Sequence, residues 1–286
     1  MRTLELPSGQ LIPVLGMGTW QMGENAKNRQ SEINALRHGI DVGLSLIDTA
    51  EMYGEGGAEE VISQAIASRR GSVFLVSKVY PHNASKQGTI ASGSARSAIA
   101  ACDRSLKRLK TDYLDLYLLH WRGSIPLAET LEAFQTLQQA GKIRSYGVSN
   151  FDVEDMKEVS QLKGGNAVAT NQVLYNLMRR GIEWNLLPWC REHRIPIMAY
   201  SPIEQGRLLN NRTLNTLARQ RGVTAAQIAL AWVLHQENVI AIPKSSRIEH
   251  IEQNYAALNL ELSADELAAL DTAFPPPTKP VSLQML

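Results

Sequence analysis

The chain has 286 residues, of which 44% are hydrophobic and 20% charged, a composition typical of globular proteins rather than disordered or fibrous ones. It carries 29 Lys and Arg against 28 Asp and Glu, without the basic excess usual in nucleic-acid-binding proteins. No apolar run approaches the roughly 20 residues that span a bilayer, and prolines and glycines interrupt the first residues, where a signal peptide needs an apolar core. We therefore expect neither nucleic acid nor a membrane as a partner.

The two cysteines, Cys102 and Cys190, are too few for the disulfide framework of a small secreted domain. Cys190 and His193 lie three residues apart in a helical pattern, but no further Cys or His is close in sequence, so no metal site is expected. No repeat or linker divides the sequence. These features favour a single domain over residues 1–286, which works as a monomer in the cytoplasm and binds a small molecule.

The first predicted element is a β-hairpin over Thr3–Val14 that turns near Pro7–Gly9. From there on, short apolar runs alternate with longer helical patterns. Several of these runs lack polar alternation, which is typical of strands buried on both faces of a parallel sheet. The eight predicted strands are Leu15–Gly18, Leu44–Asp48, Val73–Ser77, Asp115–Leu119, Ile143–Val148, Val168–Val173, Pro196–Tyr200 and Val239–Ile242.

The segments between the strands repeat apolar residues at helical spacing, as over Leu127–Leu137. Thr224–Gln227 and Ser263–Glu266 both fit the capping box that begins a helix. The proline-rich end, Pro275–Leu286, is expected to be non-helical. Eight strand–helix alternations favour an α/β fold of the (β/α)₈ TIM-barrel type over a doubly wound sheet, with the N-terminal hairpin capping one end.

A polar or aromatic side chain lies at or just past the end of each predicted strand. These residues are Trp20, Asp48, Lys78, His120, Asn150, Gln172, Tyr200 and Lys244. Strand ends often run into polar loops, which accounts for one or two such residues better than for a charged Asp, Lys and His directly after apolar runs. Because the C-terminal ends of barrel strands meet at one mouth and unpaired buried charges are costly, we expect these three to pair with one another.

Several segments resemble motifs of the aldo-keto reductases. They are Leu46–Gly54, Val76–Lys78, Leu118–Trp121, Gly147–Asn150, Thr170–Gln172, Ala199–Pro202 and Ile242–Ser245. They follow the order of the family along nearly the whole chain. Thr49–Tyr53 and Asn185–Trp189 are closest in appearance to bacterial members that reduce small aldehydes such as methylglyoxal. The resemblance implies a (β/α)₈ oxidoreductase whose catalytic tetrad is Asp48, Tyr53, Lys78 and His120.

The chemistry of carbonyl reduction gives each of these four residues a role. A free Tyr, with a pKa of about 10, is a poor acid at neutral pH, and a Lys cation beside it favours the phenolate and lowers that pKa. We expect Tyr53 to be the general acid, Lys78 to tune it, and Asp48 to hold Lys78. His120 is expected to donate a hydrogen bond to the carbonyl oxygen and set its angle.

The chain lacks a Rossmann fingerprint, because Gly16 and Gly18 are followed by Gln21 where the third glycine is required. The resemblance instead implies NADPH bound in an extended form across the barrel mouth. Ser149, Asn150 and Gln172 are expected to hold the carboxamide and Tyr200 to stack on the nicotinamide. The residues expected along the pyrophosphate are Ser201, Pro202, Ile203 and Gly206, and those expected at the 2′-phosphate are Lys244, Ser245 and Ser246.

The last predicted barrel helix departs from the common family pattern. His250 stands where many relatives have an Arg, and Gln253 precedes Asn254 where they have Glu-Asn. His titrates near neutral pH, whereas Arg stays charged, with Arg247 available nearby to compensate. We therefore expect these residues to bind NADPH in preference to NADH, which is tolerated. The preference for NADPH is expected to become smaller as the pH rises.

The substrate pocket is the least readable part of the sequence. Trp20 and Trp121, with Met52 as a third side, resemble the aromatic walls of the family, although Trp121 also fits an ordinary core position. The short tail favours an open pocket for small aldehydes and dicarbonyls. The alternative function is a non-catalytic protein on the same barrel that senses the cofactor or binds a partner.

Overall fold

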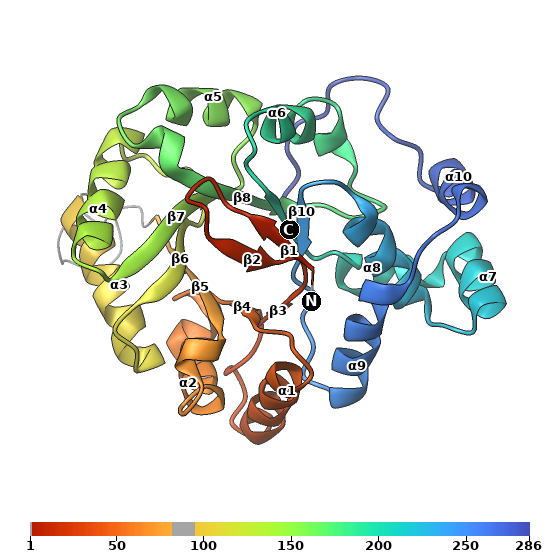
Figure 1. Ribbon diagram of the computed structural model, residues 1–286, viewed down its shortest axis with the longest axis horizontal. Coiled ribbons are helices and arrows are strands. Elements are labelled where there is room, and N and C mark those ends of the chain that lie inside the picture. Colours follow the sequence, from red (N-terminus) through yellow and green to blue (C-terminus); the bar gives the residue numbers. More distant parts are fainter. Residues whose placement is uncertain (1, 82–94) are drawn as a thin grey trace.

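The computed structural model describes residues 2–81 and 95–286, which form a ring of parallel strands surrounded by helices (Figure 1). The strands are β1 (Thr3–Glu5), β2 (Leu11–Pro13), β3 (Gly16–Gly18), β4 (Leu46–Asp48), β5 (Phe74–Val79), β6 (Leu114–Leu119), β7 (Ile143–Ser149), β8 (Val168–Leu174), β9 (Ile197–Tyr200) and β10 (Val239–Ala241). The α-helices are α1 (Arg29–Asp41), α2 (Gly57–Ala65), α3 (Ala95–Leu109), α4 (Leu127–Gln139), α5 (Val153–Gln161), α6 (Leu186–Glu192), α7 (Arg212–Arg221), α8 (Ala225–His235), α9 (Ile248–Ala256) and α10 (Ala264–Ala273).

Strands β3 to β10 pair in parallel, each with its neighbour in chain order. The two edge strands are then joined by bridges that pair Leu15 with Ala241 and Gly18 with Lys244. The Gly18 amide donates to the Pro243 carbonyl over 3.0 Å. These bonds bring β3 against β10, so the sheet curves into the predicted (β/α)₈ barrel, and each predicted strand matches an observed one within about two residues at either end.

The N-terminal hairpin lies across one end of the barrel, as the sequence predicts (Figure 1). Its strands β1 and β2 are antiparallel, and its buried side chains Leu6 and Ile12 join the apolar cluster that fills the barrel interior. The rest of that cluster comes from the strands: Leu46, Phe74, Val76, Leu116, Leu118, Ala169, Met198, Ile240 and Ile242. This end of the barrel is therefore closed by hydrophobic packing, which leaves the opposite end for chemistry.

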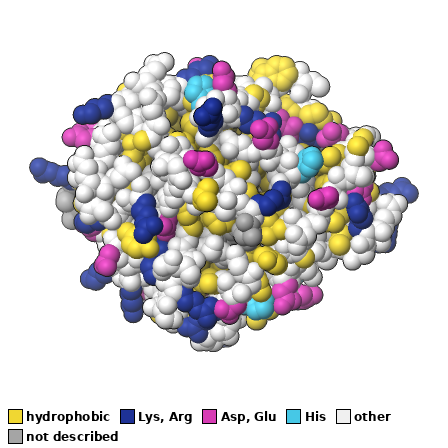
Figure 2. All heavy atoms as spheres, viewed as in Figure 1, with side chains coloured by type: hydrophobic (Ala, Val, Ile, Leu, Met, Phe, Trp, Pro, Cys, Tyr) yellow, Lys and Arg dark blue, Asp and Glu magenta, His cyan; other side chains and the backbone are white. Residues whose placement is uncertain are grey.

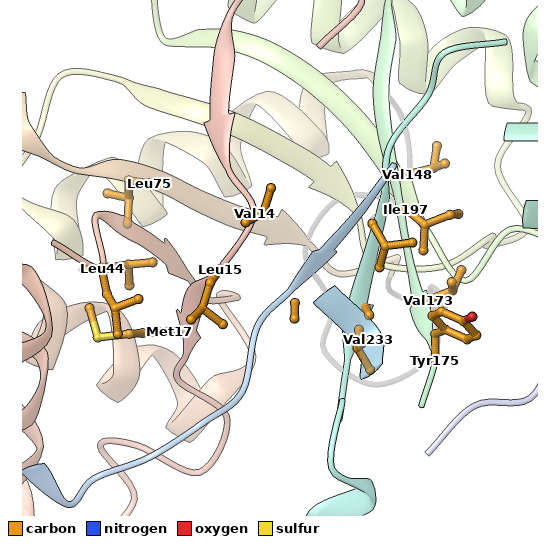
Figure 3. Packing of buried hydrophobic residues seen from close by; sticks show 14 of the residues in the cluster. Val14, Leu15, Met17, Leu44, Leu75, Val148, Val173, Tyr175, Ile197 and Val233 are labelled. Carbon is orange, nitrogen blue, oxygen red and sulfur yellow. The ribbon is translucent and has the colours of Figure 1, made fainter. Parts of the chain in front are cut away.

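A second apolar cluster packs the outside of the strands against the helices (Figure 3). It contains Leu75, Val148, Val173 and Ile197, whereas Val76 belongs to the interior cluster. Successive residues of a strand point to opposite faces, so the uninterrupted apolar runs fill both clusters at once. Acidic and basic side chains are interspersed over the face seen in Figure 2.

The two predicted capping boxes are complete: Thr224–Gln227 begins α8 and Ser263–Glu266 begins α10. Residues 275–286 form no helix, as expected, and run back from α10 toward the ring of strands (Figure 1). Within residues 2–81 and 95–286, no helix has the length and apolar character that a membrane span requires.

Candidate active site

Strand alternation places three of the four predicted catalytic residues inside the barrel, at the end opposite the hairpin. Each of the three lies two residues after an apolar residue of the interior cluster, and therefore on the same face of the chain as that residue. The pairs are Leu46 with Asp48, Val76 with Lys78, and Leu118 with His120. Tyr53 follows β4 in a short 3₁₀ helix over Tyr53–Gly56.

Lys78 is fully buried, and its ammonium has three oxygen partners. Its Nζ donates to Asp48 Oδ2 and to the Thr49 carbonyl, each over 2.8 Å, and lies 3.4 Å from the Tyr53 hydroxyl. The lysine therefore links the carboxylate to the phenol, as the sequence predicts. Three donors with three acceptors leave the buried cation fully solvated by protein oxygens.

Asp48 is held on both of its carboxylate oxygens. While Oδ2 accepts from Lys78, Oδ1 accepts from the Gln172 side-chain amide over 2.7 Å. The hydroxyl of Thr19 donates to the Asp48 carbonyl over 2.9 Å. Residues from β4, β5 and β8 thus fix the carboxylate at the barrel axis, and the contact with Gln172 was not anticipated from the sequence.

The electrostatics keep Lys78 charged and Tyr53 neutral. Burial lowers the pKa of Lys78, but Asp48 and Tyr53 together raise it by more, so that its net pKa lies above the ordinary value. Burial raises the pKa of Tyr53, and Lys78 opposes this only in part. The Lys78 charge lowers the tyrosine pKa as expected, but desolvation outweighs it, so the phenol keeps its proton at neutral pH.

His120 lies beside Tyr53, with 5.9 Å between the ring centroids. Burial, together with the Lys78 charge, lowers the pKa of His120 to about 2, so the imidazole is neutral over the physiological range. Its Nδ1 is buried and has no hydrogen-bond partner among the described residues. A neutral imidazole with one N–H suits a hydrogen-bond donor to a carbonyl oxygen.

Aromatic and apolar side chains surround this cluster. Trp121 lies 4.8 Å from His120 and 4.6 Å from Tyr80, measured between ring centroids. Trp20 and Met52 are 44% and 43% exposed, unusual for such large apolar side chains. Tyr80 was missed in the sequence, although its place two residues after Lys78 on the same strand face was a usable signal.

The residues predicted to bind the carboxamide and the nicotinamide ring gather beside the tetrad. The Asn150 amide donates to the His120 carbonyl over 3.1 Å, and its Oδ1 accepts from the Tyr200 hydroxyl over 3.0 Å. Ser149 is buried, and its hydroxyl donates to the Gln172 carbonyl over 2.8 Å. The four residues therefore form one hydrogen-bonded group at the C-terminal ends of β7, β8 and β9.

The remaining predicted cofactor residues lie further along the mouth. Ser201, Pro202, Ile203 and Gly206 belong to the loop that follows β9, while Lys244, Ser245, Ser246, His250, Gln253 and Asn254 belong to the segment after β10 and to α9. Lys244 and His250 are exposed and Gln253 half-buried. Ser245 and Asn254 are buried, and the Ser245 hydroxyl accepts a hydrogen bond from the Arg247 amide over 3.1 Å.

The end of the chain also reaches the mouth, which the sequence did not indicate. The backbone of Leu286 is hydrogen-bonded to the Tyr200 hydroxyl, and burial raises the pKa of that phenol to about 12. Leu283 packs against the outer apolar cluster and Val281 against Gly181. The short tail therefore borders the mouth at Tyr200.

Known proteins give the same assignment as this geometry. The model of the aldo/keto reductase family matches residues 14–274. The chain therefore belongs to this family of oxidoreductases, and the resemblance in the sequence is confirmed.

The similarity to individual relatives extends along nearly the whole chain. The chain is 53% identical over 280 residues to the methylglyoxal reductase YeaE of Escherichia coli, covering 96% of this chain and 95% of that protein. It is 34% identical over 271 residues to a glyoxal reductase of Bacillus subtilis, covering 94% and 91%. A crystal structure of an aldo/keto reductase from Klebsiella pneumoniae in complex with NADP and acetate superposes with a TM-score of 0.93 at 52% identity, covering 99% of both chains.

Proposed function

We propose that this protein reduces small aldehydes and dicarbonyls, with methylglyoxal as the first candidate, at the expense of NADPH. The observation that carries the proposal is the buried contact of Lys78 with both Asp48 and the Tyr53 hydroxyl, at the mouth of the barrel. The identity of 53% to a methylglyoxal reductase supports the substrate class. A further crystal structure of an aldo-keto reductase from Klebsiella pneumoniae, in complex with NADPH and 51% identical to this chain, supports the cofactor.

The mouth has the chemical groups that a nicotinamide cofactor requires. The half-buried ring of Tyr200 and the amide of Asn150 lie together beside His120, and suit the nicotinamide ring with its carboxamide. Lys244 and Arg247 are exposed cations at the other end of the mouth and suit a phosphate. We assign the carboxamide to Ser149, Asn150 and Gln172, and the pyrophosphate to Ser201, Pro202, Ile203 and Gly206. We assign the 2′-phosphate to Lys244, Ser245, Ser246, His250, Gln253 and Asn254.

When bound, the cofactor supplies the hydride. The proton comes from this chain: Tyr53, whose pKa is raised by burial, holds a proton that its hydroxyl passes to the carbonyl oxygen as the carbon–oxygen double bond becomes a single bond. Lys78 then stabilises the phenolate left on Tyr53, and Asp48 keeps the ammonium in place. His120 donates a hydrogen bond that orients the carbonyl oxygen toward Tyr53. The product is an alcohol, and Tyr53 regains its proton from water.

The walls of the mouth favour small substrates. Trp20, Met52 and Trp121 present apolar surface around the tetrad, and the Leu286 backbone borders the mouth at Tyr200. We further propose that residues 1–286 act as one catalytic domain, because the assigned site residues follow strands all around the barrel. We also propose that the protein is a monomer in the cytoplasm.

The experiment is the loss of absorbance at 340 nm when purified protein is mixed with NADPH and methylglyoxal, with NADH and an aromatic aldehyde in parallel. Saturable oxidation of NADPH, faster with methylglyoxal and slower with NADH, is expected. Tight binding of NADPH without turnover of any aldehyde would instead favour the cofactor-sensing alternative. Light scattering of the same sample tests the monomer.

A further inference from the structure

The loop that follows β9 has an unusual backbone. Ser201, Glu204, Gln205 and Gly206 all have positive φ angles, of 47°, 48°, 54° and 87°. Three of these residues carry a side chain, for which the left-handed region is unfavourable. Such a conformation persists only where the surrounding structure imposes it. The loop is also the segment assigned above to the pyrophosphate.

A buried carboxylate, that of Glu204, holds this loop on its interior side. The Glu204 side chain is fully buried, and its Oε2 accepts from the Asn176 amide over 2.8 Å. Its Oε1 accepts from Nε and Nη2 of Arg179, over 3.0 and 2.8 Å. Burial raises the pKa of Glu204, but the hydrogen bonds from Arg179 and Asn176 and the charges of Arg179 and Arg207 together lower it by more, so the group is ionised.

The same partners connect two residues of the loop, Ser201 and Glu204, to the segment after β8. Besides Glu204, the Asn176 amide donates to the Ser201 carbonyl over 2.9 Å. Asn176 is itself fully buried, and its Oδ1 accepts from the Met178 amide over 2.9 Å. The position of Ser201 relative to Glu204 is therefore set by one rigid polar cluster, consisting of Asn176, Arg179 and Glu204.

The charges of this cluster suit an anion above the loop. Arg207 adds a second guanidinium 3.7 Å from Glu204 Oε1, and its side chain is 53% exposed. The Glu204 carboxylate and the guanidinium groups of Arg179 and Arg207 together carry a net positive charge beside the loop. An unpaired carboxylate would instead repel the phosphates of a cofactor.

We propose that Glu204 is a positioning residue for the cofactor: through Asn176 and Arg179 it holds the loop Ser201–Gly206 in the shape that receives the pyrophosphate. The proposal rests on the function proposed above and extends it to a fully buried residue that is not among those assigned to the cofactor. Glu204 is the charged residue of the segment Ser201–Gly206, and its side chain is buried rather than solvated.

The test compares two fully buried glutamates. Glu204→Gln keeps the shape but loses the charge that Arg179 contacts, and we expect the Kd of NADPH, followed by its fluorescence, to rise about tenfold. The kcat at saturating NADPH and the KM for the aldehyde should stay within about twofold, because the tetrad is untouched. Glu59→Gln is the matched control: Glu59 is also fully buried and pairs with Arg108 over 2.6 Å, but on α2. It should leave the Kd of NADPH unchanged.

A wild-type Kd in folded Glu204→Gln would overturn the proposal, as would an equal rise in Glu59→Gln, which would indicate a general loss of packing. If Glu204→Gln does not fold, Arg179→Met breaks the same contact from a partly exposed position and must raise the Kd of NADPH; an unchanged Kd overturns the proposal. Failure of the wild-type protein to bind NADPH would refute the proposed function itself, and is recognised before any variant is compared.

Discussion

The two ends of the proposed cofactor site differ in how their charges are placed. At the tetrad, the side chains of Lys78 and Asp48 are 0% and 3% exposed and 2.8 Å apart. At the start of α9, the side chains of Arg247 and Glu249 are 66% and 64% exposed, at a similar distance of 3.0 Å. An ion pair of similar length therefore lies in the protein interior at one end and in water at the other.

This difference in burial decides what each pair contributes. In the interior, a lost partner leaves a desolvated charge, so removing either group is costly. In water, the pair is screened and free to exchange partners, so it contributes little to stability and remains available to a ligand. The tetrad end is thus preorganised for chemistry, and the α9 end is suited to attract a phosphate.

The largest expected difference concerns stability. Asp48→Asn removes the charge that compensates buried Lys78, and should lower the free energy of unfolding by about 3–5 kcal/mol. Glu249→Gln removes the exposed counterpart, and should change it by less than about 1 kcal/mol. Urea unfolding of both variants measures the difference. Equal losses in the two variants would contradict the comparison.

The second prediction concerns the pH dependence of stability. His120 has a folded-state pKa of about 2, whereas an unfolded His titrates near about 6.5. As the pH falls below about 6.5, the unfolded chain takes up a proton that folded His120 does not, so stability falls by up to about 1.4 kcal/mol per pH unit. His120→Asn should lack this part of the acid slope in unfolding experiments between pH 7 and about pH 4. Parallel curves for variant and wild type would show that the histidine is protonated in the folded state.

The smallest expected effect lies at the exposed end. Lys244→Ala should raise the Kd of NADPH roughly three- to tenfold and leave that of NADH almost unchanged, because an exposed cation contributes only a screened attraction. The loss should shrink as salt is raised from low to high concentration. Titrations of both cofactors at two ionic strengths check this, and a loss that is independent of salt would place Lys244 in a desolvated contact instead.

The sequence predicted the barrel because its signals are local. The apolar runs, the two capping boxes and the hairpin turn each depend on residues close together in the chain. Because the C-terminal ends of barrel strands meet, these signals also placed Asp48, Lys78 and His120 at one mouth. The predicted strand Val73–Ser77 ended two residues before β5 does. A charged Lys78 is typical of a loop, and only its contact with Asp48 accounts for its burial within the strand.

The residues that were missed depend on contacts between distant segments. Glu204 looks like a solvated loop residue, and its burial follows from Asn176 and Arg179 in the segment after β8. The contact of Gln172 with Asp48 joins β8 to β4, which only the closed barrel brings together. The net pKa of Tyr53 could not be predicted for the same reason: the sequence indicates the lysine that lowers it but not the depth of burial that outweighs the lysine.

The central claim is that Tyr53 is the proton donor, and the most direct test measures turnover and cofactor binding in Tyr53→Phe. The variant removes one hydroxyl, which lies 3.4 Å from Lys78. The kcat for methylglyoxal should fall by about 10²–10⁴-fold, while the Kd of NADPH stays within about twofold of the wild-type value. A variant that retains more than about a tenth of the wild-type kcat would contradict the account, because another group would then supply the proton.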